Sequence, residues 1–277
     1  MQLFDANRVV RTLFAVIDFE VIRNRFVASA SALENRLDRL EPVARDLEEI
    51  LGASGNPSAR LRHFAVMLED RVDSISSELD QVRSALRRIA SREYDVCLGC
   101  GSTLPRHLLE RLPYSVNCSP CSRTFPLDYS EQLSTQHAEL RRQIKQLSSI
   151  LESAALCSES RELARLKWKA TSLLLADFEG ELDEHFKNEE QDGYLAEALA
   201  AAPQLTRQAV ALERQHADFR ERSRALTRLG NGNGEIPDHW GYLRNRFDAL
   251  GRDLLTHENA EGDLISTAFG VDIGAGD

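Results

Sequence analysis

The fold is decided first by residues 33–51, which read LENRLDRLEPVARDLEEIL. Apolar residues recur here at steps of three and four, beginning just before the stretch: Ala30, Leu33, Leu37, Leu40, Ala44, Leu47 and Leu51. These steps place side chains on one face of a helix, and a sustained heptad rhythm is typical of a coiled coil. The turn-forming residues 52–58, GASGNPS, then end the helix.

A second heptad helix follows this turn. Its apolar positions are Leu61, Leu68, Val72, Ile75, Leu79, Val82, Leu86 and Ile89. Two heptad helices joined by a short turn should fold back as an antiparallel coiled-coil hairpin, here over residues 30–92. A spacer or dimerisation coiled coil is an equally good interpretation of the pattern. We expect residues 1–29 to form a further N-terminal helix, or an extension that packs on a neighbouring domain.

The overall composition indicates an all-α protein, because Leu, Ala, Arg and Glu dominate and aromatic residues make up only 6%. The net charge is -10, while residues 1–129 hold 17 arginines and 18 acidic residues, so the acidic excess lies in the C-terminal part. Phosphate backbones are bound through cationic side chains, so we expect no direct DNA binding and favour a protein partner or a metal. No stretch reaches the roughly 20 apolar residues of a membrane span, and no signal-peptide layout is seen. The expected location is therefore the cytoplasm, without membrane association.

Residues 93–128 differ from the helices because Gly, Pro, Cys and Ser cluster there. Cys97-Leu-Gly-Cys100 and Cys118-Ser-Pro-Cys121 form two C-x₂-C knuckles separated by seventeen residues. Two such knuckles complete a tetrahedron of thiolates, which suits one structural Zn²⁺ and leaves no open coordination position. Four free thiols or a redox pair are the alternative. The segment has few apolar residues, so the metal should supply most of its folding energy.

Three motifs of this segment resemble the DksA/TraR C4-type zinc finger. They are residues 89–101, IASREYDVCLGCG, then Arg111-Leu-Pro113, then Cys118-Ser-Pro-Cys121. The resemblance extends more loosely over the hairpin and covers about residues 30–128. Members of that family bind RNA polymerase and insert the hairpin tip, with its D-P-x-D-x-A motif, into the secondary channel. Here the tip reads Asn56-Pro-Ser-Ala-Arg-Leu61. The resemblance therefore implies polymerase binding without the usual acidic tip.

From about Ser130 the helical rhythm returns, with four long helices expected near 131–152, 160–190, 204–229 and 238–269. They predict an up-down four-helix bundle over residues 131–270. Six polar residues fall at core positions of its apolar seams: His137, His185, Glu189, His216, His257 and Glu261. Burying such groups without partners costs several kcal/mol for each charged group, so a metal cluster is the natural explanation. Hydrogen-bonded core histidines and simple helix pairs are the alternative.

The same residues resemble the hemerythrin-like (HHE) domain over about residues 131–269. The matching segments are His137, HFKNEE at 185–190, ERQH at 213–216 and HENAE at 257–261. The resemblance implies two non-haem iron ions, each with two imidazoles, and two bridging carboxylates. Oxygen-carrying hemerythrins have a second histidine one turn after the third-helix histidine, where this chain has Arg220. The ligand set is therefore closer to the regulatory and sensor members. The sequence leaves manganese or zinc open as alternatives to iron.

The two resemblances together predict a zinc-finger regulator that contacts RNA polymerase and whose di-iron domain senses O₂, NO, redox state or iron. The main alternative is a non-transcriptional oxygen- or iron-binding protein in which hairpin and finger serve only assembly. A peroxide- or NO-consuming di-iron enzyme is a third interpretation. No general acid, nucleophile or substrate pocket is indicated, so we expect a binding protein rather than an enzyme and name no catalytic residue.

Overall fold

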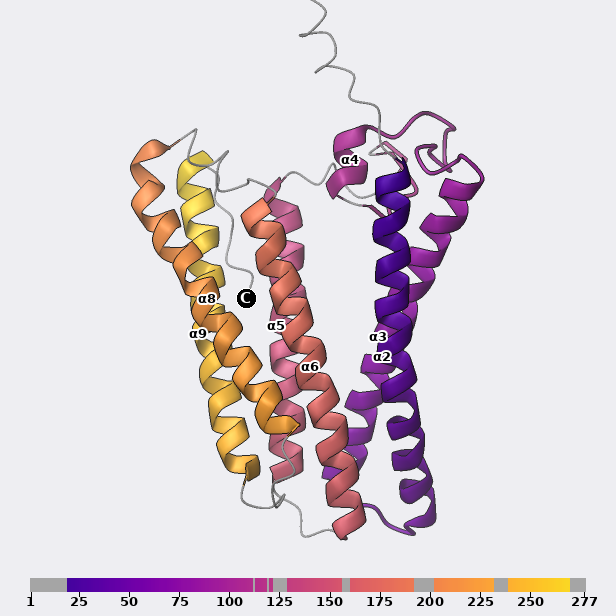
Figure 1. The fold of residues 1–277 in the computed structure, drawn as a ribbon, viewed down its shortest axis with the longest axis vertical. Helices are drawn as coiled ribbons and strands as arrows, with labels where there is room; N and C mark the ends of the chain where they lie inside the picture. The colour runs from indigo at the N-terminus through magenta and orange to yellow at the C-terminus, as the bar shows by residue number, and fades with distance from the viewer. Residues whose placement is uncertain are drawn as a thin grey trace, which may run out of the picture. The chain divides into compact units, whose positions relative to one another are not determined.

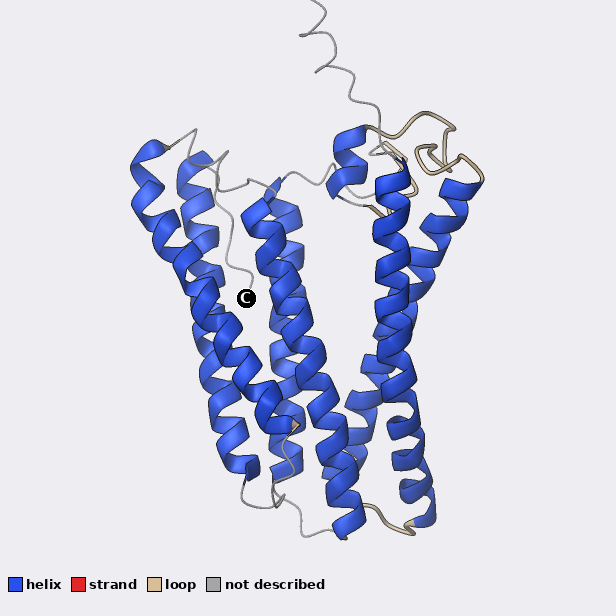
Figure 2. Cartoon of the chain, in the orientation of Figure 1, coloured by secondary structure: helices blue, strands red, loops and turns tan. Residues whose placement is uncertain are grey.

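The computed structural model describes residues 19–111, 113–118, 120–121, 129–155, 160–191, 202–231 and 239–269. These residues are mostly helical, as Figure 2 shows, and the only β-type pairing among them is an isolated bridge between Val96 and Thr103. The all-α prediction is confirmed. The chain divides into two compact units, Met1–Leu37 with Ser74–Pro126, and Asp38–Asp73 with Leu127–Asp277.

The first unit contains parts of the two hairpin helices, α2 (Phe19–Ala53) and α3 (Ala59–Ala90). Within it the two helices lie side by side (Figure 1), and Arg83 of α3 donates to Glu34 of α2 at 2.9 Å. Helix α2 begins at Phe19 and continues past residue 30 without a break. The described part of the N-terminal segment is therefore an extension of the hairpin helix, and residues 1–18 lie outside the described residues.

The hairpin seam differs from the predicted one at several positions. Val43 is fully buried, whereas Ala44 is only half-buried. Both residues continue a three–four pattern, and burying the larger valine removes more apolar surface from water. On α3, Ala85 is buried instead of Leu86. Two charged residues are also buried, Arg71 instead of Val72 and Arg88 instead of Ile89. Apolar periodicity cannot find an arginine that is buried by its hydrogen-bond partners.

The finger follows α3 and contains one short helix, α4, which spans Arg106–Arg111. Arg88 fastens the finger to α3. Its guanidinium donates to four backbone carbonyls, those of Glu93, Tyr94, Val96 and Ser115, at 2.8–3.3 Å. The ring of Tyr94 is fully buried and packs edge-on against Phe26 of α2. Residues 122–128, the predicted end of the finger, lie outside the described residues.

The second unit contains a four-helix bundle. Its helices are α5 (Tyr129–Ala155), α6 (Arg161–Gln191), α8 (Thr206–Gly230) and α9 (His239–Phe269), with a 3₁₀ turn, η1 (Pro203–Leu205), before α8. These bounds agree with the four predicted helices to within three residues. Each helix packs against its neighbours in the chain, and α9 returns to pack against α5, which closes the up-down bundle (Figure 1).

Aromatic pairs fill the bundle core below the polar residues. Phe178 meets Phe247 edge-on at 5.4 Å, and Trp168 meets Trp240 edge-on at 4.9 Å. On α9, Leu243 is buried between these two layers, and Leu250 and Leu254 are fully buried between Phe247 and His257. Among the described residues, no helix has the length and apolar character needed to cross a membrane.

The part of the hairpin that belongs to this unit also contacts the bundle. The guanidinium of Arg71 contacts the Glu181 carboxylate of α6, and the Lys167 ammonium lies 5.6 Å from the ring centre of Phe64. The tip half of the hairpin therefore has polar partners of its own within this unit.

Candidate metal centres

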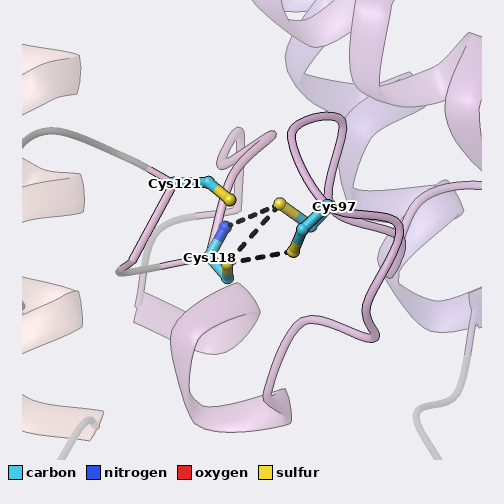
Figure 3. A group of neighbouring side chains, drawn as sticks. Cys97, Cys118 and Cys121 are labelled. Carbon is cyan, nitrogen blue, oxygen red and sulfur yellow. Dashed lines mark hydrogen bonds between the residues drawn. The ribbon is translucent and has the colours of Figure 1, made fainter.

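The four finger cysteines come together as the knuckle spacing predicts. Their sulfur atoms all lie within 4.8 Å of one another, with Cys97 to Cys118 at 3.6 Å and Cys100 to Cys118 at 3.5 Å. Figure 3 shows the sulfurs of Cys97, Cys118 and Cys121 facing one another. A tetrahedron with Zn–S bonds of about 2.3 Å has sulfur atoms roughly 3.8 Å apart, so the observed spacing fits one Zn²⁺.

The backbone prepares these thiols for metal binding. The amide of Cys118 donates to Sγ of Cys97 at 3.2 Å, and this bond lowers the pKa of the Cys97 thiol to about 6. Thiolate is the form that binds zinc, so a lowered pKa favours binding near neutral pH. Gly99 is required for the close turn, because a Cβ there would lie 2.8 Å from Cβ of Cys121. Gly101 has a φ of +72°, a conformation that glycine adopts without strain.

The bundle site is built from all four long helices. The six predicted residues are brought together with one more, Glu258: His137 on α5, His185 and Glu189 on α6, His216 on α8, and His257, Glu258 and Glu261 on α9. His185 is 12% exposed at its side chain, and the other six are buried. The residues lie on one turn of each helix, since His185 and Glu189, like His257 and Glu261, are four positions apart.

These residues form two groups of potential ligands. The first comprises His137, His185, Glu189 and Glu258, and the second comprises Glu189, His216, His257 and Glu261. Glu189 belongs to both groups. Within the first group, Nε2 of His137 lies 2.5 Å from Oε2 of Glu258, and Nε2 of His185 lies 2.9 Å from Oε1 of Glu189.

The second group is equally tight. Nε2 of His216 lies 3.1 Å from Nε2 of His257, and Oε1 of Glu261 lies 3.3 Å from His257 and 3.7 Å from His216. Glu189 approaches His216 as well, with its Oε2 at 3.5 Å from Nε2. The second carboxylate oxygen of Glu261 lies 4.0 Å from His137 of the first group. Glu189 and Glu261 thus reach toward both groups, which fits a bridging position.

Buried polar atoms at the centre of the bundle fit a pair of cations. Nε2 of His137, Oε2 of Glu258 and both carboxylate oxygens of Glu189 and of Glu261 make no hydrogen bond with any residue that the structure describes. Leaving such atoms buried and unpaired is costly, whereas cations held between them would satisfy all of them at once. Imidazole and carboxylate ligands together suit iron, manganese or zinc.

Electrostatics in the metal-free bundle follow from the same contacts. Burial opposes the charged form of His185, but the nearby carboxylates of Glu189 and Glu258 outweigh it and raise the pKa of this histidine to about 10. Burial likewise opposes the charge on Glu258, yet His137 and His185 lower its pKa to about 2. A proton on His185 balances carboxylate charge here, and binding of metal to this imidazole has to displace it.

A second layer of contacts holds the ligand side chains in place. The Phe186 ring is fully buried and stacks on the His216 imidazole, with ring centres 4.1 Å apart and planes at 13°. Nδ1 of His257 lies 3.2 Å from Oε1 of Gln215, and Nδ1 of His216 lies 3.1 Å from Oε1 of Glu190. The ring nitrogens on the opposite side, both Nε2, are the ones that face the cluster.

Glu258 is the residue of this site that the sequence analysis missed. The predicted seam of α9 passed through Leu254, His257, Glu261 and Leu264, while a second stripe, Gly251, Leu254, Glu258, Glu261 and Ile265, is also buried throughout. Both stripes keep steps of three and four. The signal was the E-x-x-E spacing of Glu258 and Glu261, which places a second carboxylate on the core side of the helix.

Comparison with known proteins gives one finding for the bundle. Neither a curated protein nor a solved structure matches the chain. The family model described as the Hemerythrin HHE cation binding domain matches residues 128–261, which include all seven residues of the bundle site. This part of the chain, a four-helix bundle, is therefore similar to the hemerythrin-type cation-binding domain.

Proposed function

We propose that the protein is an iron-dependent regulator that binds two iron ions in its bundle and one zinc ion in its finger. One observation carries the iron half of the proposal: two buried ligand groups that share Glu189 lie at the centre of a hemerythrin-type bundle. A pair of irons there would allow the bundle to sense O₂, NO, redox state or iron.

The chain's own residues divide between the two irons. His137, His185 and Glu258 would hold the first, and His216 and His257 would hold the second, with Glu189 and Glu261 within reach of both. Three carboxylates against two divalent ions leave one positive charge in a buried site. A small anion or a polarisable diatomic ligand is favoured at such a place. The apolar aromatic layer on one side of the cluster, with Phe186 at its centre, excludes water from the ligands.

The regulatory half of the proposal rests on the resemblance of finger and hairpin to DksA/TraR, and RNA polymerase is the partner we propose. At the hairpin tip, Asn56 and Ala59 stand where that family has its two aspartates. The hydroxyl of Ser58 accepts from the amide of Leu61 at 3.2 Å, so it caps α3. The hairpin tip therefore lacks the two acidic groups of that family. We propose that it binds polymerase but does not perform the chemistry of those groups.

Absence of the tip carboxylates favours a second candidate, a non-transcriptional iron- or oxygen-binding protein whose hairpin and finger serve assembly. A binding assay separates the two. The iron-loaded and iron-free proteins are each titrated with purified RNA polymerase, with a chain truncated after the finger as a further sample. Binding that depends on iron supports the regulator. No binding in either state leaves the second candidate.

Metal content tests the iron half. We expect mass spectrometry of protein purified without air to find about one zinc and two irons per chain. Glu258→Gln should lower iron to about one per chain and leave zinc unchanged. Glu221→Gln, an exposed glutamate on α8, is the matched control and should retain both irons. A wild-type protein that takes up no iron after reconstitution would show that the core histidines are structural.

A further inference from the structure

Arg220 lies on α8 one turn after the ligand His216 and makes three hydrogen bonds to α6. Its Nε donates to Oδ1 of Asp183 at 2.9 Å. Its Nη1 and Nη2 donate to Oε1 and Oε2 of Glu190 at 2.7 and 3.2 Å. Two parallel bonds to one carboxylate fix the orientation of that carboxylate, because the guanidinium fork is planar and rigid. The guanidinium carbon also lies 5.3 Å from the centre of the Phe186 ring.

Glu190 passes this constraint on to His216. Its Oε1 accepts from Nδ1 of His216 at 3.1 Å. A proton held on Nδ1 leaves the lone pair on Nε2, and Nε2 is the nitrogen that faces His257, Glu189 and Glu261. The stack of Phe186 on the imidazole fixes the plane of the ring. Glu190 thus fixes the tautomer and the direction of the His216 ring, and Phe186 fixes the plane of the ring.

The two imidazoles of the second group differ in what supports them. His257 has the neutral amide oxygen of Gln215 at its Nδ1, whereas His216 has a carboxylate that is backed by an arginine. Arg220 and His216 both donate to the Glu190 carboxylate. A charged acceptor makes the imidazole a stronger ligand than a neutral one does.

We propose that Glu190 and Arg220 are positioning residues that hold His216 for metal binding. The proposal rests on the metal site proposed above. Arg220 acts through Glu190 and touches no metal itself. In this chain the Glu190–Arg220 pair supports the metal site indirectly, by holding the ligand His216. A histidine at position 220 would instead bind the metal directly.

The test compares Arg220→Gln, Arg220→Lys, Glu190→Ala and the double variant Glu190→Ala/Arg220→Gln with the wild type. Arg228→Gln is the matched control, because Arg228 lies on the same helix and pairs with Glu221 at 2.7 Å, with both side chains 63% exposed. Affinity for Fe²⁺ is measured without air by competition with a chromophoric chelator. A proton NMR spectrum of each metal-free protein follows the Nδ1 proton of His216.

We expect Arg220→Gln and Glu190→Ala to bind the more weakly held Fe²⁺ about 10- to 100-fold less tightly than wild type. Arg220→Lys should lose less, and the double variant should be no weaker than Glu190→Ala because Arg220 acts through Glu190. Arg228→Gln should match wild type. Equal affinities in wild type, Arg220→Gln and Glu190→Ala would overturn the proposal.

The NMR measurement keeps this inference separate from the proposed function. If the wild type binds no iron, the function fails, yet the positioning role is still tested. A slowly exchanging Nδ1 proton of His216 in wild type and Arg228→Gln, lost in Glu190→Ala and faster in Arg220→Gln, supports the role. The same exchange in all proteins contradicts it. Glu190 is an exposed residue in the last turn of α6, so Glu190→Ala retains the bundle core, which circular dichroism verifies.

Discussion

The finger and the bundle both gather metal ligands, but they do so in opposite ways. The finger takes four thiolates from two short knuckles, with a few buried side chains such as Tyr94, Leu104 and Leu109 around them. The bundle takes seven ligands from four helices, and these helices already bury aromatic and aliphatic layers of their own. In the finger, bound metal would supply the folding energy that a hydrophobic core usually supplies. In the bundle, the hydrophobic core itself positions the potential ligands.

This difference has an energetic consequence. Apparent binding energies of structural zinc are about 10–16 kcal/mol, and in a segment with few apolar contacts they are folding energy. The bundle carries its buried polar atoms within a core of apolar and aromatic contacts. Removing metal should therefore unfold one region and leave the other folded.

The largest expected effect comes from removing zinc. Cys118→Ser, or a zinc chelator on the wild type, should cost the finger on the order of 10 kcal/mol. Hydrogen exchange followed by mass spectrometry should then show full loss of protection for residues 94–118 and unchanged protection in α8 and α9. The control is Ser102→Ala, which removes the hydroxyl 2.9 Å from Cys100 but keeps all four thiols. Retained protection of residues 94–118 after zinc loss would show that the finger, like the bundle, folds without metal.

A cavity at the bundle site should have the next largest effect. Phe186→Ala removes a fully buried ring that contacts His216, Phe219 and His257. Large-to-small changes of this kind cost about 3–5 kcal/mol, and the free ligand rings should also bind metal less tightly. Urea unfolding of the metal-free protein measures the first effect. Phe178→Ala, in the layer with Phe247, is the control that opens a cavity away from the ligands.

Arg88 tests what holds the finger besides zinc. Arg88→Met removes the donors to four carbonyls and should destabilise the first unit by about 2–4 kcal/mol, because hydrogen bonds of a buried charged group are worth about 1.5–3 kcal/mol. Arg87→Met on the neighbouring, exposed position is the matched control and should change little. Thermal unfolding of the zinc-loaded proteins measures the difference. Equal stability of the two variants would show that zinc alone organises the finger.

The sequence predicted the elements well because their signals are local. Knuckle spacing placed all four finger thiols, and steps of three and four placed the bundle helices and six of the seven bundle ligands. The residues whose burial the sequence did not predict have a property in common. Glu258, Arg71 and Arg88 are buried charges, and a charged residue is read as surface unless its partner is known. Those partners, His137 and His185, Glu181 and the finger carbonyls, lie far along the chain or on the backbone, so only the fold reveals them.

The smallest expected effect concerns Pro42, which lies inside α2 and is exposed. A proline there cannot donate to the carbonyl of Asp38, the residue at which the second unit begins. Pro42→Ala restores the backbone donor and improves helix propensity by about 3 kcal/mol. It also gives the unfolded chain more conformational freedom, which opposes folding, so the net stabilisation should be about 2 kcal/mol. Urea unfolding measures it, and hydrogen exchange at residues 38–46 should slow. Unchanged exchange there would show that the division between the two regions does not depend on the missing bond. A gain confined to these amides would place the weakest point of the hairpin near the residue of α2 at which the second unit begins, and would support separate unfolding of finger and bundle.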